Sequence, residues 1–423
     1  MSASGPYLGS RRHFLCCGAA ALAGLLGSTA AQAAPWGTAC RPGLPAGAQD
    51  FLAAGWQGLD AALLWDVHSH LLGNGDSGSG AFLHPSLTQG FNLIERARHR
   101  VILDAACVPA DAASVDRAYV ERLRTLTQDF PAGARWLLFA FEQAHDDQGR
   151  PDRERTTMYV PDAYTAAVAQ AQAPVFGWVA SIHPYRDDAL SRLEQAAQRG
   201  TAAIKWLPGA MNIDLRDRRC RPFYDRLARL GLPLIVHCGE EKAVPGARRH
   251  DLGNPLHVRE PLNLGVRVIV AHCASLGEAE DSDKPSAPLV PAFDLFARLM
   301  GHAAWEGQLW GDLSAVFQAN RRPEVWHALL QRSGWHGRLL HGSDYPLPGL
   351  SLLTRLGKLR AAGLIDETQE TQLDTLREHN PLLFDLMLKR SLQLGSQRFD
   401  AAVFATRRAF PASAGGTATA PGG

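Results

Sequence analysis

The sequence predicts an α/β fold, a distorted (β/α)8 barrel of the TIM type with extra elements near its N-terminus. Short apolar runs alternate with amphipathic stretches, such as Asp187–Arg199 and Phe223–Leu230, whose apolar residues recur at three- and four-residue spacing. Several runs end in histidine, lysine or aspartate, and the active sites of such barrels lie at strand ends. The first run leads into His68-Ser69-His70, whereas a glycine-rich phosphate loop usually follows the first strand of an open, doubly wound sheet.

Nine apolar runs are strand candidates, one more than a barrel of eight strands requires. We therefore expect one of the two early runs, Val101–Val108 or Trp136–Phe141, to lie outside the barrel or to pair at its rim, and the pattern does not distinguish between them. The other candidates are Leu63–Val67, Val175–Ile182, Ala202–Leu207, Pro233–His237, Val266–His272, Leu309–Leu313 and Leu339–Asp344.

The barrel is expected to span residues 61–395. Residues 34–60 are rich in glycine, proline and alanine and are interpreted as an irregular lead-in. The helix and strand pattern fades after about Arg390, and the chain ends in the low-complexity sequence FPASAGGTATAPGG. We therefore expect a disordered tail over residues 396–423.

Residues 1–33 have the order of segments found in secretory signals. The sequence SRRHFL, which begins at Ser10, precedes a mild apolar stretch over Cys16–Leu26, and Ala31-Gln32-Ala33 provides a cleavage site. The apolar stretch is too short for an ordinary membrane-spanning helix. This pattern resembles bacterial twin-arginine export signals. The resemblance implies the twin-arginine export machinery as a partner and a periplasmic or secreted protein, with a retained anchor as the alternative.

The charge balance restricts the classes of ligand that the protein binds, and the cysteine spacing restricts its metal sites and disulfides. With 43 basic and 42 acidic residues, the chain lacks the electrostatic footprint of a nucleic-acid-binding or lipid-binding protein, so a small molecule is the expected partner. A homo-oligomer remains open. Five of the seven cysteines follow the signal, at wide spacings that fit neither a cysteine zinc site nor a disulfide framework. An oxidising compartment would permit one bridge, but the sequence does not name the pair.

Polar side chains that bind metals end five of the runs. His68 and His70 are two residues apart, so in a strand their side chains point to the same face. Buried imidazole and charged groups are costly without compensation, which suggests a shared cation at the strand ends. The other residues at the run ends are Lys205, His237, His272 and Asp344.

This order of residues resembles the amidohydrolase superfamily. The local sequences DVHSH, VHCGEE, AHCAS and HGSDYP resemble its amidohydrolase-related branch, over roughly Leu63–Phe384. The resemblance implies metal ligands at the two histidines of the first run, at His237 and at Asp344. It implies that His272 either binds a second metal or acts as an acid–base group. A lysine at the position of Lys205 is carboxylated and bridges two metals in binuclear relatives, and is absent or structural in many others, so both readings stay open.

The resemblance also implies a chemistry. A divalent cation lowers the pKa of bound water from 15.7 towards ~7, which makes a nucleophile available at neutral pH. Asp344 is expected to take the proton from the attacking water and to deliver it to the leaving group. Imidazole and carboxylate ligands suit zinc first, with manganese, iron or nickel as alternatives, at one or two ions per chain.

The sequence therefore predicts a metal-dependent hydrolase that acts on a C–N or C–O bond of a small molecule, in an amide, lactone or ester. A metal-dependent non-oxidative decarboxylase of an aromatic or unsaturated carboxylic acid is the first alternative, because it shares most of the ligands. A non-catalytic exported binding protein is the alternative from another class. That reading requires missing ligands, and no ligand position is missing from this sequence.

Four further residues are candidates for substrate binding. Glu240 follows His237 on a loop at the barrel mouth, where a solvated charged loop is the plain reading. Arg259 could hold a substrate carboxylate in a bidentate fork or lie on the surface. His183 and Tyr185 follow the run that ends at Ile182 and are candidates for the wall of the substrate pocket.

Overall fold

The structure is a computed structural model, and it describes residues 40–89, 93–244, 247 and 249–412. The predicted signal over residues 1–33 lies outside this range, as does the end of the predicted tail over residues 413–423. Among the described helices, none combines the length and the apolar character that crossing a membrane requires.

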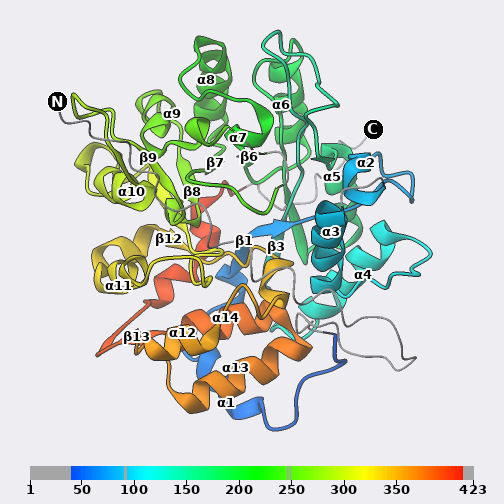
Figure 1. Cartoon of the computed structure of the whole chain (residues 1–423), viewed down its shortest axis with the longest axis vertical. Coiled ribbons are helices and arrows are strands. Elements are labelled where there is room, and N and C mark those ends of the chain that lie inside the picture. Colours follow the sequence, from blue (N-terminus) through cyan, green and yellow to red (C-terminus); the bar gives the residue numbers. More distant parts are fainter. Residues whose placement is uncertain (1–39, 90–92, 245–246, 248, 413–423) are drawn as a thin grey trace, which may run out of the picture. The chain divides into compact units, whose positions relative to one another are not determined.

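Parallel strands form the expected barrel (Figure 1). One sheet has the order β1-β3-β5 and the other the order β6-β7-β8-β11-β12, and bridges Ala180↔Ile204 and Ser69↔Tyr345 join the two sheets at both edges. The α/β barrel fold is therefore confirmed. The strands are β1 (Trp65–His70), β3 (Arg135–Phe139), β5 (Phe176–Val179), β6 (Ile204–Trp206), β7 (Leu234–His237), β8 (Val268–Ala271), β11 (Leu309–Asp312) and β12 (Leu339–Leu340).

The surplus strand candidate is Val101–Val108, most of which belongs to helix α3 (Leu93–Ala105). The run continues a stretch of good helix formers without a breaker, and its buried residues Leu103 and Ala105 lie on a helix that otherwise carries arginines. The other early run, Trp136–Phe141, forms β3 between β1 and β5.

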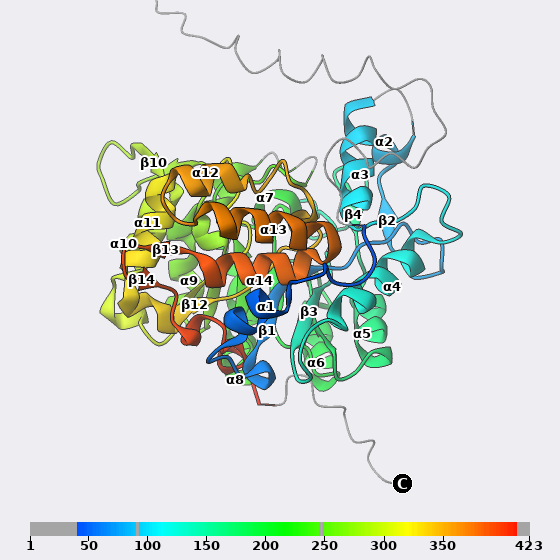
Figure 2. The ribbon, with the colours of Figure 1, turned by 90° about the horizontal axis from the view of Figure 1, so that it is seen from below.

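Helices follow most strands, as the alternating pattern predicts. The two amphipathic stretches named above correspond to α6 (Ala189–Gln198) and α8 (Arg221–Leu230). Figure 2 shows α13 and α14 side by side, with α1 next to α14. The remaining α-helices of the described residues are α1 (Gln49–Trp56), α2 (Pro85–Thr88), α4 (Val115–Thr127), α5 (Asp162–Ala171), α7 (Pro208–Met211), α9 (Arg259–Asn263), α10 (Ala292–Met300), α11 (Pro323–Gln331), α12 (Leu356–Ala361), α13 (Glu367–His379) and α14 (Pro381–Ser391).

Short antiparallel pairs lie outside the barrel. They are β2 (Phe82–Leu83) with β4 (Met158–Tyr159), β9 (Glu278–Glu280) with β10 (Leu289–Pro291), and β13 (Gln393–Leu394) with β14 (Gln397–Arg398).

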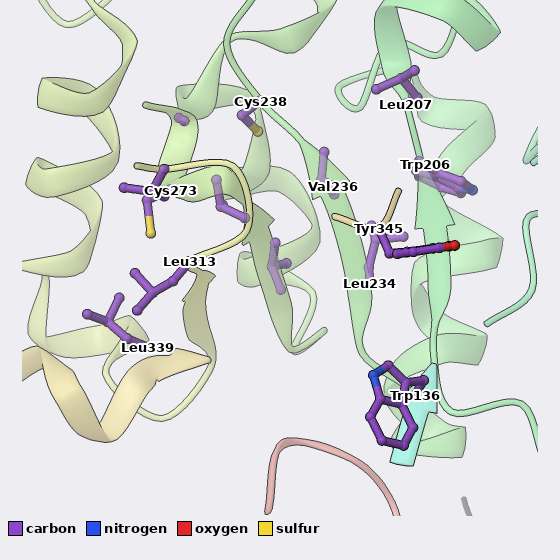
Figure 3. Close-up of a cluster of buried hydrophobic side chains, with 14 of the residues drawn as sticks. Trp136, Trp206, Leu207, Leu234, Val236, Cys238, Cys273, Leu313, Leu339 and Tyr345 are labelled. Carbon is purple, nitrogen blue, oxygen red and sulfur yellow. The ribbon is translucent and has the colours of Figure 1, made fainter. Parts of the chain in front are cut away.

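Two apolar clusters divide the side chains of the barrel strands. Along β7, Leu234 and Val236 belong to the outer cluster, part of which Figure 3 shows, whereas Ile235 belongs to the inner cluster. Successive residues of a strand point to opposite faces, so His237 continues the inward series of Ile235. The same alternation in β8 places Ile269 and Ala271 inside. The alternation along β7 therefore aims the side chain of His237 inward, whereas His272 directly follows the inward Ala271 and leaves this alternation at a φ of 55°.

The segment after residue 396, which we expected to be disordered, is ordered as far as Ala412. Thr406 Oγ1 accepts a hydrogen bond from the backbone N–H of Trp65 at 2.7 Å, and the ring of Phe410 stacks on that of Trp65 at 5.8 Å. Phe410 belongs to the inner cluster. The expectation was wrong for this segment because its apolar residues are too few to form a core of their own but suffice to cover the start of β1.

The lead-in, which we expected to be irregular, contains helix α1, and Arg390 of α14 donates to Gly55 O of that helix at 2.8 Å. The lead-in also contains Cys40, which forms a disulfide with Cys107, 67 residues further along the chain. This is the pair that the cysteine spacing could not name.

Candidate metal centre

Three of the predicted ligands converge where β1 meets the loop after β12. Asp344 Oδ1 lies 3.1 Å from His70 Nε2 and 3.4 Å from His68 Nε2. His68 and Asp344 are buried, and the side chain of His70 is 24% exposed. Ligand atoms at this spacing are close enough to share one ion. The histidine pair and the aspartate, 274 residues apart, therefore form one cluster.

The backbone holds Asp344 directly against β1. Its N–H donates to His68 O at 2.7 Å, and its φ of 62° lies in the left-handed region. A side chain at Gly342 would put its Cβ 2.8 Å from the Cβ of His68, so only glycine allows this approach. Asp66 Oδ1 accepts from the N–H groups of both His68 and Ser343. These contacts fix the loop that carries Asp344. They also hold Asp344 itself at a positive φ, which is costly for a residue other than glycine.

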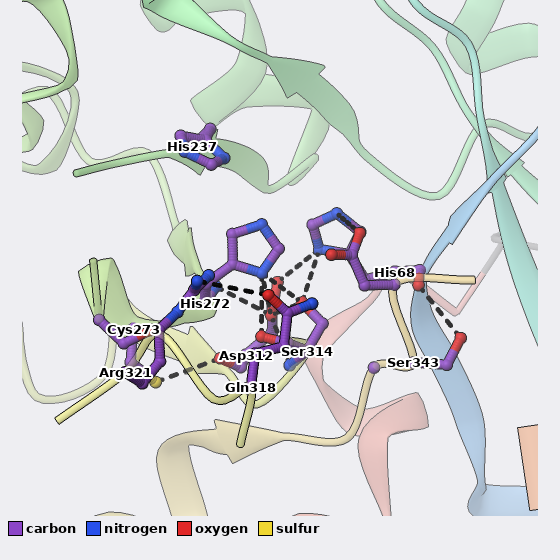
Figure 4. A network of polar contacts seen from close by, with 12 residues as sticks. His68, His237, His272, Cys273, Asp312, Ser314, Gln318, Arg321 and Ser343 are labelled. Atoms are coloured by element: carbon purple, nitrogen blue, oxygen red, sulfur yellow. Dashed lines mark hydrogen bonds and ion pairs between the residues drawn. The ribbon is translucent and has the colours of Figure 1, made fainter. Parts of the chain in front are cut away.

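Asp312, at the end of β11, lies behind the histidines (Figure 4). Its Oδ2 accepts from His68 Nδ1 at 2.9 Å, and its Oδ1 accepts from the backbone N–H groups of His272 and Ser314, each at 3.0 Å. Burial opposes the charge of Asp312, but His68, His272 and Lys205 together hold the pKa of this carboxyl below its usual range. Asp312 therefore accepts the Nδ1 proton of His68 and leaves Nε2 to face Asp344.

His272 follows β8 with a φ of 55°, and its Nδ1 lies 2.9 Å from Ser314 O. A carbonyl can only accept, so Nδ1 carries the proton and Nε2 has the free lone pair. The ring lies between those of His68 and His237, with centroids 4.7 Å and 5.1 Å away. His272 therefore joins the cluster from the β8 side.

His237 and Lys205 complete the predicted set. His237 Nδ1 lies 3.3 Å from Glu241 Oε2, and burial lowers the pKa of His237 to about 4. Burial also lowers the pKa values of His68 and His272, so all three imidazoles are neutral at pH 7. The Nζ of Lys205, in β6, is buried and lies 5.2 Å from the ring of Phe139.

The residues present fit a divalent cation. Among the described residues, His68 Nε2, His237 Nε2 and Lys205 Nζ are buried and make no hydrogen bond. Buried polar atoms in native proteins nearly always have a partner, and a cation would provide one for the imidazole lone pairs. Neutral imidazoles with a carboxylate are the donor set that zinc and related metals prefer.

Glu240 and Arg259 have other partners in the structure. Glu240 forms an ion pair with Lys242 at 3.1 Å, and it is the neighbouring Glu241 that contacts His237. Both terminal nitrogens of Arg259 donate to Asp283 at 2.6 Å. Asp283 thus occupies the guanidinium of Arg259, and no contact in the described residues joins this side chain to the histidine cluster.

His183 and Tyr185 lie in a second aromatic group. His183 Nε2 donates to Met211 O at 2.9 Å, and its Nδ1 accepts from the N–H of Tyr185. The ring of His183 lies 4.1 Å from that of His145, and the hydroxyl of Tyr185 accepts from the N–H of Asp214. Both nitrogens of His183 are thus used to hold the chain around Met211, and no hydrogen bond joins either residue to the metal cluster in the described chain.

Two residues of this region were missed by sequence reasoning. The sequence does indicate Asp312, because this residue lies near the end of the apolar run Leu309–Leu313. The prediction treated the whole run as apolar and did not single out its one acidic residue. Arg321 had none, because it lies on the loop between β11 and α11, where no strand pattern indicates its direction.

Three solved structures with a similar course of the chain are distant in sequence. An uncharacterised TIM-barrel protein from Bordetella bronchiseptica is 17% identical with a TM-score of 0.46, covering 74% of this chain and 95% of the other. The 5-carboxyvanillate decarboxylase of Sphingomonas paucimobilis is 12% identical, with a TM-score of 0.40 and coverage of 73% and 95%. The 4-oxalomesaconate hydratase of Rhodopseudomonas palustris is 14% identical, with a TM-score of 0.40 and coverage of 73% and 92%. These likenesses are too weak to indicate a substrate.

No curated protein matches the chain. The amidohydrolase family model, in contrast, matches residues 65–382, which is about three quarters of the chain and includes all the strand-end residues described above. The chain therefore belongs to the amidohydrolase family and is an enzyme of the amidohydrolase superfamily.

Proposed function

We propose that this enzyme is a metal-dependent hydrolase of a C–N or C–O bond in a small amide, lactone or ester. The observation that carries the proposal is the contact of one Asp344 oxygen with the Nε2 atoms of both His68 and His70 at the barrel mouth. Zinc is the proposed metal, since the ligand atoms are imidazole nitrogens and a carboxylate oxygen.

The chain's own residues provide binding and proton transfer. His68, His70, His237 and Asp344 would hold the ion, which when bound lowers the pKa of a coordinated water towards ~7. Asp344 would accept a proton from the attacking water and return it to the leaving group, since its Oδ1 already lies at the centre of the cluster. A positioned acid–base group of this kind contributes typically about 10²–10⁴-fold in rate.

The number of metal ions depends on Lys205. Its buried, unpartnered Nζ fits either a lysine that becomes carboxylated or a neutral amine, because burial lowers the pKa of Lys205. Elemental analysis decides: two ions per chain support the bridging role, one ion supports a mononuclear site with His272 as the acid–base group, and a chain without metal after gentle purification contradicts the proposal.

Asp344→Asn tests the proton-transfer role. We expect the variant to fold and to lose nearly all turnover, and more than about a tenth of wild-type activity would contradict the assignment. Asp225→Asn is the matched control, because Asp225 is exposed on α8.

Non-oxidative decarboxylation is the second candidate, and the orientation of His272 favours it. Ser314 fixes the Nδ1 side of the ring, so Nε2 is available to exchange a proton with a substrate carbon. Assays on lactones and amides, run beside assays for CO₂ release from aromatic acids, distinguish the two reactions.

We also propose that the protein is exported by the twin-arginine route and works in the periplasm or outside the cell. The Cys40–Cys107 disulfide supports an oxidising compartment, since such bridges are rare in the cytosol. Replacing Arg11 and Arg12 by lysine should retain the precursor in the cytoplasm. N-terminal sequencing of the exported wild-type protein should find a chain that begins near Ala34. Detection of the lysine variant in the periplasm would contradict the twin-arginine route.

A further inference from the structure

The side chain of Arg321 is buried in the loop between β11 and α11, with a residue exposure of 9%. Its guanidinium donates only to neutral oxygens: Nε to Ser275 Oγ at 3.1 Å, and Nη1 to Asn320 Oδ1 at 2.7 Å and Gln318 Oε1 at 3.3 Å. Within the described residues, no carboxylate forms an ion pair with it. A buried charge with no carboxylate in direct contact is costly, so this arrangement requires an explanation.

The guanidinium lies next to the chain segment that carries His272. Ser275 is three residues beyond His272, and its N–H donates to His272 O at 2.9 Å. Figure 4 shows Arg321 close to His272. Burial lowers the pKa of Arg321 to about 10, and Asp344 and Glu241, which follow different strands, attract its charge. Arg321 is therefore a cation at neutral pH at the same end of the barrel as the metal ligands.

The loop holds this side chain in place. Trp326 donates to Val316 O at 2.8 Å, and Lys358 donates to Ala319 O at 3.0 Å, so both halves of the loop are fixed to neighbouring helices. The three neutral acceptors fix Nε and Nη1. No acceptor for Nη2 occurs in the part of the chain that the structure describes, so its two N–H groups remain for a ligand.

We propose that Arg321 binds a carboxylate group of the substrate, which makes the substrates small monocarboxylic acids. The charged Nη2 can donate to a carboxylate oxygen, and the three contacts that fix Nε and Nη1 reduce the entropy lost on binding. A single negative charge fits better than a phosphate dianion, because Glu240 and Glu241 lie near the same guanidinium. The identification of the bound acid as substrate rests on the proposed hydrolase function, but the binding site itself does not.

Binding of benzoate and its neutral analogue benzamide tests the proposal, by calorimetry on the metal-loaded and the chelator-treated protein. We expect wild type to bind benzoate more tightly than benzamide in both forms. Arg321→Gln should weaken benzoate binding roughly 10- to 100-fold and leave benzamide unchanged, since hydrogen bonds to charged groups have this value. Arg321→Lys, which keeps the charge but loses the contacts that fix the guanidinium, should bind benzoate with an affinity between those of wild type and Arg321→Gln. Phenyl phosphate should bind no more tightly than benzoate.

Arg259→Gln is the matched control, because Asp283 occupies the Arg259 fork, and it should leave benzoate binding unchanged. Equal benzoate affinity in wild type and both Arg321 variants would overturn the proposal. So would benzoate binding that occurs only in the metal-loaded form and is unaffected at Arg321, because the metal alone then takes the carboxylate. The chelator-treated arm remains informative if the metal analysis contradicts the hydrolase, so the two proposals fail separately.

Discussion

Asp312→Asn is predicted to weaken metal binding by changing which nitrogen of His68 carries the proton. Two backbone N–H groups, of His272 and Ser314, donate to Asp312 Oδ1, so the side-chain amide of asparagine must keep its oxygen there. Its NH₂ then replaces Oδ2, 2.9 Å from His68 Nδ1. A donor at that place requires Nδ1 to accept, and the ring proton moves to Nε2, which faces Asp344 and can then no longer bind a metal.

The expected loss is 10- to 100-fold in metal affinity, the usual effect of changing a residue behind a ligand, or about 1.4–2.7 kcal/mol. Competition with a chromogenic chelator measures it, with circular dichroism as the check on folding. Asp400→Asn is the control, because Asp400 lies 3.0 Å from His336 Nδ1 in a second histidine–aspartate pair. A zinc affinity of Asp312→Asn within three-fold of wild type would refute the tautomer argument.

Three further predictions concern stability and close packing. Replacing Cys40 and Cys107 by serine opens a 67-residue loop and should lower the free energy of unfolding in urea by about 4 kcal/mol, whereas an unchanged midpoint would show that the bridge does not form. Burial lowers the pKa of His183 to about 3, so the stability that neutral His183 contributes is present above pH 6.5 and is lost as the pH falls towards 3. His183→Gln should therefore reduce the drop in the free energy of unfolding between pH 8 and pH 5 by about 2 kcal/mol. Parallel pH–stability curves of wild type and variant would contradict this. Gly342→Ala places a methyl 2.8 Å from the Cβ of His68 and should weaken metal binding, whereas Gly334→Ala, with nothing within 4 Å, should not.

The barrel and the position of the strand-end residues were predictable because they depend on local pattern. Each strand is a short apolar run, and a residue at the end of a run in a parallel barrel lies at the catalytic face whatever the details of packing. His237 shows this directly, since the alternation along β7 aims it inward. The choice between Val101–Val108 and Trp136–Phe141 was not predictable, because short apolar runs occur in buried helices and strands alike.

The partners of the ligands were not predictable, since they depend on loops and on contacts between distant segments. Arg259 has the residue type that binds carboxylates, but Asp283 occupies it, and that pairing follows from the fold. Arg321 has the same residue type on a loop without periodicity, and only its neutral neighbours distinguish it. The residue type indicates which ligands a side chain can bind. Whether the side chain is available to bind them depends on whether another residue of the folded chain already occupies it.

Strand β1 carries His68 and His70, yet its pairing is irregular, with a register shift against β3 between Asp66 and Ser69. Its position therefore depends on contacts made by segments far away in the sequence. Thr406 holds the start of the strand through Trp65, and the loop after β12 holds its end through the Asp344 N–H. The ordered C-terminal segment, which has no residue in the cluster, consequently contributes to the metal centre by fixing the strand from which both histidines project.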